Sequence, residues 1–327
     1  MAEPAITRHV LCDGDVSVAI LNLGCITQDW RVPLGRERVP VVLGHADPQD
    51  YRTHPGTLGV IAGRLANRTA GARFTWDGRE YQLPANDGRH HLHGGPEGLS
   101  RRIWAVETDG QRAIQLSRVS PEGEAGYPGT LGLSVRITLS GFTLRYEMIA
   151  RADRPVPVNL AQHNYYNLMG RGDIAEHRLQ IAASACTPTD AELIPSGEIA
   201  PVAGTDLDFR QMRAIGRQAI DINMVLDDPG AGPGMGFRSR PAARLRAPNG
   251  LELVLETDQP GLQLYTGAGL RPRGRPHPGQ SHDAFGGLCL EPQHFPNAVN
   301  TPGFAVPVAA PEAPYRQVTT VTIAPAP

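Results

Sequence analysis

Lysine is absent from this chain of 327 residues, so all 31 of its basic residues are arginine. Without lysine, the protein cannot form a Schiff base with a carbonyl substrate or with pyridoxal phosphate. It also cannot build the nucleotide-binding P-loop, which requires a lysine. The composition therefore excludes lysine-dependent aldolases, transaminases and P-loop enzymes.

Cysteine is scarce as well. The four cysteines, Cys12, Cys25, Cys186 and Cys289, lie far apart and form no CxxC pair. Such spacing is a poor basis for either a disulfide framework or a zinc site. We expect free, mostly buried thiols, which are typical of a protein in a reducing compartment.

Strong charge and long hydrophobic runs are also missing. The net charge is −2 and the isoelectric point is near 6.6, which favours neither nucleic acid nor an anionic membrane as a partner. No apolar run approaches the ~18 residues of a membrane span. The N-terminus, MAEPAITRHVL, lacks the basic start and apolar core of a signal peptide. We therefore expect a soluble cytoplasmic protein, either a monomer or a homodimer.

Glycine and proline, by contrast, are abundant at 37 and 30 residues, which favours turns and short strands over long helices. Arms of alternating polar and apolar residues flank Asp77-Gly78, Ser140-Gly141 and Asn249-Gly250, dipeptides that suit tight hairpin turns. Short alternating runs also occur in residues 1–50, whereas helical periodicity is confined to Phe209 to Ala219. The pattern predicts an all-β, antiparallel protein.

No long linker or change in composition divides the chain, so we expect one domain over residues 1–327. Two loop-rich stretches occur late in the chain, Asp227 to Pro241 and Arg271 to Ser281. The first contains GAGPGMG, but its glycines do not match GxGxxG and no βα unit surrounds them. We interpret it as a flexible surface loop and not as a nucleotide site.

The stretch Pro157 to Leu168, PVNLAQHNYYNL, carries more hydrogen-bonding side chains than a core strand needs. It places His163 among asparagine, glutamine and tyrosine side chains that apolar residues frame. Buried amides and phenols need hydrogen-bond partners, so such a run is typical of the wall of a pocket for a polar ligand. An ordinary core histidine in a polar network is the alternative, and the other motifs decide between the two.

Residues 59–95 hold a second polar cluster. Asn67 and Arg68 precede a hairpin, and His93 follows it within LHGG, whose glycines allow a ligand to approach the backbone closely. His91 and His93 are two residues apart and would share one face of a regular strand. A metal would need a third ligand, and nothing nearby supplies one at a recognisable spacing.

Glu291 follows the apolar run Leu288 to Leu290 and precedes Pro292. A carboxylate at the end of a buried strand loses hydration, which raises its pKa and makes it a usable general base. A surface position or an ion pair with arginine is the alternative. Gln263 and Tyr265 occupy alternating positions of a further strand, GLQLYTG.

Together these motifs resemble the aldose 1-epimerase (galactose mutarotase) family. GRLANR, LHGG, PVNLAQHNYYNL, LQLYTG and LEPQHFPNAVN occur in that family's order, and the similarity spans roughly residues 20–323. The resemblance implies a large antiparallel β-sandwich of the supersandwich type with a sugar-binding cleft on one concave sheet. It also implies that the protein interconverts the α and β anomers of a monosaccharide, a free aldose such as galactose or glucose, without a metal or organic cofactor.

The same resemblance assigns roles to individual residues. It implies that Glu291 is the catalytic base and His163, in its protonated form, the catalytic acid. Sugar-binding roles fall on Asn67, Arg68, His93, Tyr165, Asp221 and Gln263. Asp221 lacks the tyrosine and histidine that usually flank this aspartate in the family, so the preferred aldose stays open.

Three alternatives share part of this pattern. A glycoside hydrolase generally needs two carboxylates about 5–10 Å apart, and Asp221 would have to be the second one. A sugar-phosphate epimerase needs a cluster of cations, for which Arg64, Arg68 and Arg89 are available. A carbohydrate-binding or sensing module would keep the pocket but would not need both an acid and a base.

Overall fold

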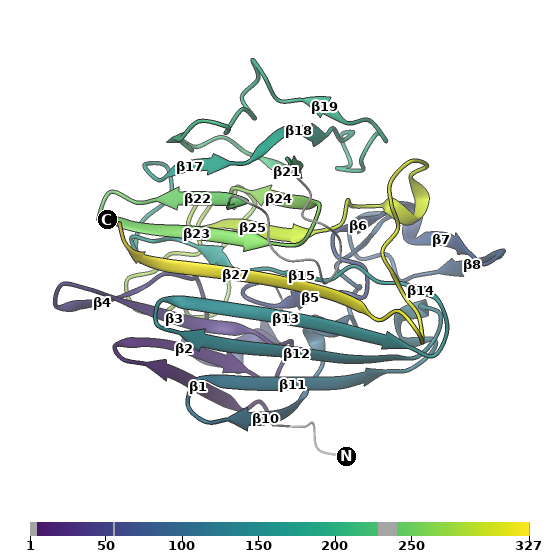
Figure 1. Cartoon of the computed structure of the whole chain (residues 1–327), viewed down its shortest axis with the longest axis horizontal. Helices are drawn as coiled ribbons and strands as arrows, with labels where there is room; N and C mark the ends of the chain where they lie inside the picture. The colour runs from purple at the N-terminus through teal and green to yellow at the C-terminus, as the bar shows by residue number, and fades with distance from the viewer. Residues whose placement is uncertain (1–4, 55, 228–240, 327) are drawn as a thin grey trace.

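The computed structural model describes residues 5–54, 56–227 and 241–326, which form antiparallel strands with very little helix. Figure 1 shows long antiparallel strands side by side in front and shorter strands behind them. The helical pieces are one short α-helix, α1 (Asp50–Thr53), and four single 3₁₀ turns: η1 (Ala70–Ala72), η2 (Leu99–Arg101), η3 (Glu124–Gly126) and η4 (Ala298–Asn300). None of the described helices is long and apolar enough to cross a membrane.

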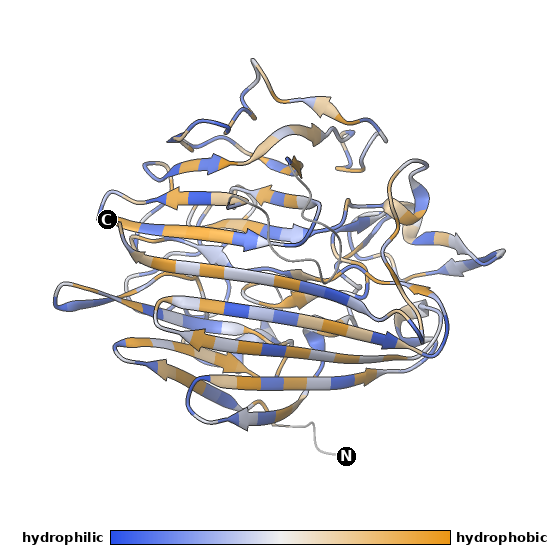
Figure 2. Ribbon diagram, in the orientation of Figure 1, coloured by the Kyte–Doolittle hydropathy of each residue, from blue (hydrophilic) through white to orange (hydrophobic). Residues whose placement is uncertain are grey.

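The largest sheet has nine strands. Their order across the sheet is β10 (Ala105–Asp109), β11 (Ala113–Ser120), β12 (Leu131–Ser140), β13 (Thr143–Ala152), β27 (Tyr315–Pro325), β23 (Leu251–Thr257), β22 (Ala243–Arg246), β17 (Arg178–Ile181) and β20 (Arg213–Ala214). Buried and more exposed residues alternate along β12 and β13, as expected of strands with one face against a core. Figure 2 shows this alternation as orange and blue bands.

A six-stranded sheet lies against it and carries most of the polar motifs. Its strands, in order, are β16 (Tyr165–Tyr166), β25 (Leu288–Gln293), β24 (Gly261–Tyr265), β21 (Asp221–Leu226), β18 (Ala183–Thr187) and β19 (Ala200–Pro201). A four-stranded meander forms the N-terminal part: β1 (Arg8–Asp13), β2 (Val16–Leu21), β3 (Thr27–Leu34) and β4 (Glu37–Pro40).

Short strand pairs complete the fold. They are β5 (Ile61–Ala62) with β15 (Ala161–Gln162), β6 (Arg68–Thr69) with β9 (His91–Leu92), β7 (Arg73–Trp76) with β8 (Arg79–Gln82), and β14 (Val156–Pro157) with β26 (Val308–Ala309). One hydrophobic cluster joins the inward faces of all three large sheets, with Val18, Ile137 and Leu264 as examples. The predicted antiparallel β-sandwich is confirmed, whereas one domain over residues 1–327 stays a prediction.

The hairpins predicted from sequence are present. Asp77 and Gly78 both have positive φ in the turn between β7 and β8, and Gly250 does so between β22 and β23. The turn between β12 and β13 consists of Gly141 and Phe142, one position later than predicted. The four cysteines are free, as expected, and three of them are buried.

Two expectations fare differently. The helix predicted over Phe209 to Ala219 is wrong, because this segment forms turns around the two-residue strand β20. The backbone of β20 pairs with β17, so sheet edge pairing outweighs a weak helical pattern. Arg271 to Ser281 is a loop as predicted, whereas residues 228–240 of the other predicted loop lie outside the described residues.

A buried arginine ties the segment before β6 to the nine-stranded sheet. Arg64 is 2 % exposed, and its guanidinium donates hydrogen bonds to the backbone carbonyls of Ser120, Pro121, Pro128 and Gly129. Its Nε also donates to the Ser120 hydroxyl. These bonds give each of the four carbonyls a buried donor, and they fix the chain just before Asn67 and Arg68.

We predict that Arg64→Met lowers the free energy of unfolding by at least about 2 kcal/mol, because each buried carbonyl left without a donor costs about 1–3 kcal/mol. Urea denaturation followed by fluorescence measures the change. Arg36→Met, at an exposed position, is the control and should stay within about 0.5 kcal/mol of the parent. Equal denaturation midpoints for the two variants would contradict this role of Arg64.

Candidate active site

A cavity of about 700 Å³ opens over one face of the six-stranded sheet. All eight residues singled out from the sequence line it: Asn67, Arg68, His93, His163, Tyr165, Asp221, Gln263 and Glu291. These residues come from five segments far apart in the chain, residues 67–93, 163–165, 221, 263 and 291, so only the fold brings them together. The sequence-based set is therefore one spatial site, although the role of each member stays a prediction.

Strand register places the polar side chains in rows across the sheet. Gln263 of β24 pairs with Asn223 of β21 on one side and with Glu291 of β25 on the other. In the next row, Tyr265 pairs with Asp221 and with Cys289. Because alternate residues of a strand share a face, both rows face the same side of the sheet, where the cavity lies.

The sequence suggested that the strand carrying Glu291 ends at that residue, before Pro292. The strand instead continues through Pro292 to Gln293. All six residues of β25, Leu288–Gln293, are buried and extended. The neighbouring strand β16 pairs only with Leu288 and Cys289, so among the described residues no strand pairs with that edge at Pro292, where an N–H would otherwise be needed. Glu291 therefore projects from within a strand, which holds it more firmly than a strand end would.

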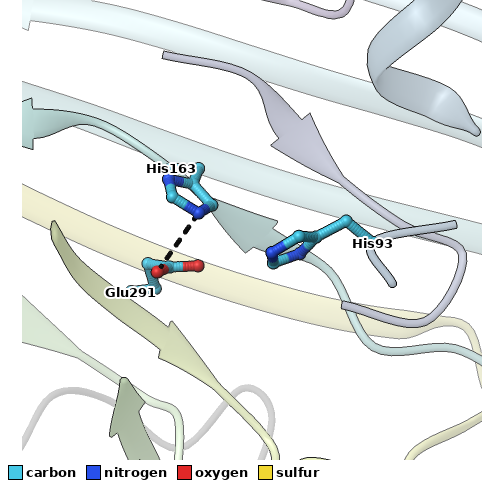
Figure 3. A group of neighbouring side chains, drawn as sticks. All are labelled: His93, His163 and Glu291. Carbon is cyan, nitrogen blue, oxygen red and sulfur yellow. Dashed lines mark ion pairs between the residues drawn. The ribbon is translucent and has the colours of Figure 1, made fainter. Parts of the chain in front are cut away.

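Glu291 and His163 face each other at the bottom of the cavity. Glu291 Oε1 lies 3.4 Å from His163 Nε2, and the two residues are 2 % and 3 % exposed (Figure 3). This separation exceeds an ideal hydrogen bond, which leaves both groups available to a ligand. Glu291 Oε2 is buried without any partner among the described residues, so it is an acceptor or donor that a ligand could satisfy.

Burial controls the protonation of this pair. It raises the pKa of Glu291 well above its ordinary value, with a further rise from the carboxylate of Asp221 and an opposing effect of Arg68. Burial also lowers the pKa of His163 to about 4, opposed by a hydrogen bond to its own backbone carbonyl. Both shifts favour the uncharged form. The pocket therefore favours a neutral carboxyl group beside a neutral imidazole over an ion pair of the two side chains.

His93 is held differently. Its ring Nδ1 accepts a hydrogen bond of 3.1 Å from the backbone N–H of Asn67, and the backbone N–H of His93 donates to the Asn67 carbonyl. Because Nδ1 is an acceptor, the neutral ring carries its hydrogen on Nε2. Burial and the nearby His163 and Arg68 keep the pKa of His93 well below its ordinary value. His93 is therefore an uncharged hydrogen-bond donor.

His91 and His93 do not share a face, contrary to the expectation from their spacing. β9 ends at Leu92, and His93 has a φ of 53°, in the left-handed region. The His91 ring contacts the Tyr127 hydroxyl and the Pro84 carbonyl, each at 2.7 Å, and takes no part in the cavity wall. The change of backbone region at His93 is what turns its side chain toward His163.

The structure does supply the third ligand that the sequence did not, because His93, His163 and Glu291 have nitrogen or oxygen atoms within 4.8 Å of one another. The hydrogen bonding of His93 does not suit a metal. Coordination through Nε2 would require a hydrogen on Nδ1, directed at the N–H of Asn67. Coordination through Nδ1 would displace that N–H from its acceptor. The trio therefore fits proton exchange better than metal binding.

An ionic chain runs along one side of the cavity. Arg68 Nε contacts Asp87 Oδ2 at 2.7 Å, and its Nη1 lies 3.6 Å from Asp221 Oδ2. Asp221 Oδ1 accepts a hydrogen bond of 2.6 Å from Gln263 Nε2. Asp87 was not singled out from the sequence because Asn86-Asp87-Gly88 reads as an ordinary turn. The chain of contacts holds these polar side chains in place along the cavity.

Aromatic rings form another part of the cavity wall. Tyr165 stacks on His163 with ring centroids 5.1 Å apart, and its hydroxyl lies 3.0 Å from Thr57 Oγ1. Tyr265 meets Tyr165 edge to face. Such a wall suits the apolar face of a sugar ring.

The cations proposed for a phosphate group are not gathered here. Arg64 is committed to backbone carbonyls, and Arg89 pairs with Glu192 at the surface. Arg68 lines the cavity but is paired with two carboxylates. The site therefore suits an uncharged, hydroxyl-rich ligand.

Comparisons with known proteins agree with this geometry. Residues 7–322 match the sequence profile of the aldose 1-epimerase family. A galactose mutarotase from Rattus norvegicus is 37% identical, over 96% of this chain and 93% of that protein. An aldose 1-epimerase from Escherichia coli K12 is 33% identical, over 89% of this chain and 86% of that protein.

Solved structures show the same fold. An aldose epimerase homologue from C. elegans superposes with a TM-score of 0.90 at 26% identity, covering 99% of this chain and 100% of that one. A galactose 1-epimerase from Lactobacillus acidophilus gives a TM-score of 0.81 at 24% identity, covering 99% of both chains. The chain belongs to the aldose 1-epimerase family and is an isomerase.

Proposed function

We propose that this protein is an aldose 1-epimerase that interconverts the α and β anomers of free aldoses such as galactose or glucose. The observation that carries the proposal is the 3.4 Å contact between His163 and Glu291 at the bottom of a cavity lined by polar side chains. Relatives named galactose mutarotase and aldose 1-epimerase support it.

The reaction needs one base and one acid. Glu291, as a carboxylate, takes the proton of the anomeric hydroxyl, while His163, as an imidazolium, gives a proton to the ring oxygen. The C1–O5 bond breaks, and the open aldehyde forms. Rotation about C1–C2 presents the other carbonyl face, and reversal of both proton transfers closes the ring as the other anomer.

The proton balance of the pair favours this cycle. Ring opening leaves Glu291 protonated and His163 neutral, which is the state that burial favours in the free site. Before ring opening, the same single proton resides on His163. The pocket therefore offsets part of the cost of forming the open aldehyde, because the enzyme reaches its preferred protonation state at the same step.

The other residues hold the sugar. Arg68, Asp221 and Gln263 present a fixed set of donors and acceptors to the hydroxyl groups, with Asn67 beside them. His93 donates from Nε2 to the ring oxygen and stays uncharged, so it assists without competing for the proton. Tyr165 and Tyr265 contact the ring face.

Hydrolysis and phosphate chemistry are less well supported. Asp221 is engaged by Arg68 and Gln263, which makes it a poor second carboxylate for glycoside cleavage. The free cysteines are consistent with a reducing compartment, and we place the protein in the cytoplasm as a monomer or homodimer that acts on a monosaccharide, without a nucleic-acid or membrane partner.

We predict that Glu291→Gln and His163→Asn each lower kcat for mutarotation about 10²–10⁴-fold, the usual contribution of a positioned acid or base. Polarimetry of freshly dissolved α-D-galactose and α-D-glucose measures the rate, after subtraction of the spontaneous reaction. Glu256→Gln on β23 and His9→Asn on β1 are matched controls outside the cavity.

Near-parental rates in either active-site variant would refute the assignment of that residue. Acceleration with neither sugar in the parent protein would refute these substrates, and pentoses and 6-deoxy sugars would be tested next. Release of nitrophenol from nitrophenyl galactosides would instead indicate a hydrolase.

We also predict a bell-shaped dependence of kcat/KM on pH, whose apparent pKa values belong to the pair. Below the lower pKa the pair takes up a second proton: His163 becomes an imidazolium while Glu291 stays protonated, and no base is left. Because the pKa of His163 is lowered to about 4, activity should persist well below pH 6.5. The upper limb reports loss of the shared proton. A lower limb centred at or above pH 6.5, measured by polarimetry with buffer blanks, would contradict this.

A further inference from the structure

One strand contacts both ring nitrogens of His163. Glu291 Oε1 lies 3.4 Å from Nε2, and Cys289 Sγ lies 3.4 Å from Nδ1. Cys289 and Glu291 are two residues apart on β25 and therefore face the same side of the sheet. Both are buried, as is His163. The thiol thus occupies the position behind the ring that sets which nitrogen carries the hydrogen.

The chemistry of ring closure requires one tautomer of neutral His163. After the imidazolium has given its Nε2 hydrogen to the ring oxygen, Nε2 must hold a lone pair so that it can take that proton back. The remaining hydrogen must then reside on Nδ1, where it needs an acceptor. The acceptors there are the Cys289 sulfur and the carbonyl of His163 itself.

We propose that Cys289 is a positioning residue that accepts the Nδ1 hydrogen of His163 and so holds the ring in its proton-accepting tautomer, with Nε2 toward Glu291 and the sugar. This inference rests on the proposed mutarotase function. No proton leaves the thiol, since burial raises the pKa of Cys289 well above its ordinary value. The single exchanged proton passes between Nε2 and the sugar oxygen.

Sulfur suits this place because it is a weak, uncharged acceptor. A carboxylate behind the ring would stabilise the imidazolium and raise the pKa of His163, which would make it a poorer acid. The thiol orients the ring without that effect. His93 is the contrasting case, since the N–H of Asn67 behind its ring enforces the opposite tautomer and makes it a permanent donor.

The groups around His163 are consistent with this reading. Glu291 faces Nε2, His93 meets the ring edge to face at 5.1 Å, and Tyr165 stacks on it at 5.1 Å. Arg68 and Asp221 act on Glu291 from the other side of the cavity. Among the described residues, Cys289 supplies the side-chain partner of Nδ1.

The direct test is nitrogen NMR of the full-length protein labelled with ¹⁵N-histidine, at neutral pH, with His163→Asn and His93→Asn used to assign the signals. We expect His163 to show a protonated Nδ1 and an unprotonated Nε2, and His93 to show the reverse. Observation of hydrogen on Nε2 of neutral His163 would overturn the proposal.

Kinetics of substituted proteins provide the second test. Cys289→Ala should lower kcat about 5–30-fold with KM within about 2-fold, the effect of losing one buried hydrogen bond. Cys289→Ser restores an acceptor and should recover kcat to within about 3-fold of the parent. Because oxygen is the better acceptor, Cys289→Ser should also move the lower limb of the pH profile to higher pH.

Cys186→Ala is the matched control, because Cys186 is a buried cysteine of the same sheet outside the cavity. It should leave kcat and the pH profile unchanged. If Cys289→Ala and Cys289→Ser keep the parental pH profile, Cys289 is only a packing residue and the proposal fails. That failure is distinct from failure of the proposed function, which active Glu291→Gln or His163→Asn variants would signal.

Discussion

The loss of water around one carboxyl group and one imidazole is the constraint on which this site depends. Glu291 and His163 line the bottom of the cavity and are almost fully buried, so a charge on either one is costly. If both side chains were permanently charged, they would form an ion pair, and the proton would stay on His163. The buried pair instead shares one proton that a bound sugar can redistribute, and the surrounding residues keep this balance: Asp221 raises the pKa of Glu291 and Arg68 opposes that rise.

Such a balance requires a rigid scaffold, because a pKa set by burial changes as soon as water enters. The sandwich provides it by carrying Glu291 within a fully buried strand and His163 in a segment whose backbone pairs with Gly59 and Val60. The segment just before Asn67 has little regular structure, and the buried guanidinium of Arg64 fixes it through hydrogen bonds to backbone carbonyls. Close packing and hydrogen bonds away from the cavity thus keep the positions of its side chains fixed.

The sequence contains enough information for the fold class, the hairpins and the set of cavity residues, because these depend on local turns, on period-two patterns and on motifs. It does not contain the features that depend on backbone conformation at single residues. The left-handed φ of His93 separates it from His91, and no spacing rule predicts that. Asp87 joins Arg68 only through the fold. Cys289 could have been found, since it lies two residues before Glu291 on the same face of one strand.

The absence of lysine limits the side chains that can exchange protons with a sugar. In and next to this cavity the groups that could exchange protons are few, because burial raises the pKa values of Tyr165, which lines the cavity, and of Cys289 behind it. Arg68 is paired with two carboxylates, so its role is to orient a sugar. His93 has a low pKa and a fixed tautomer. Proton exchange is therefore left to His163, whose Nδ1 contacts the Cys289 sulfur, and to the buried carboxyl group of Glu291.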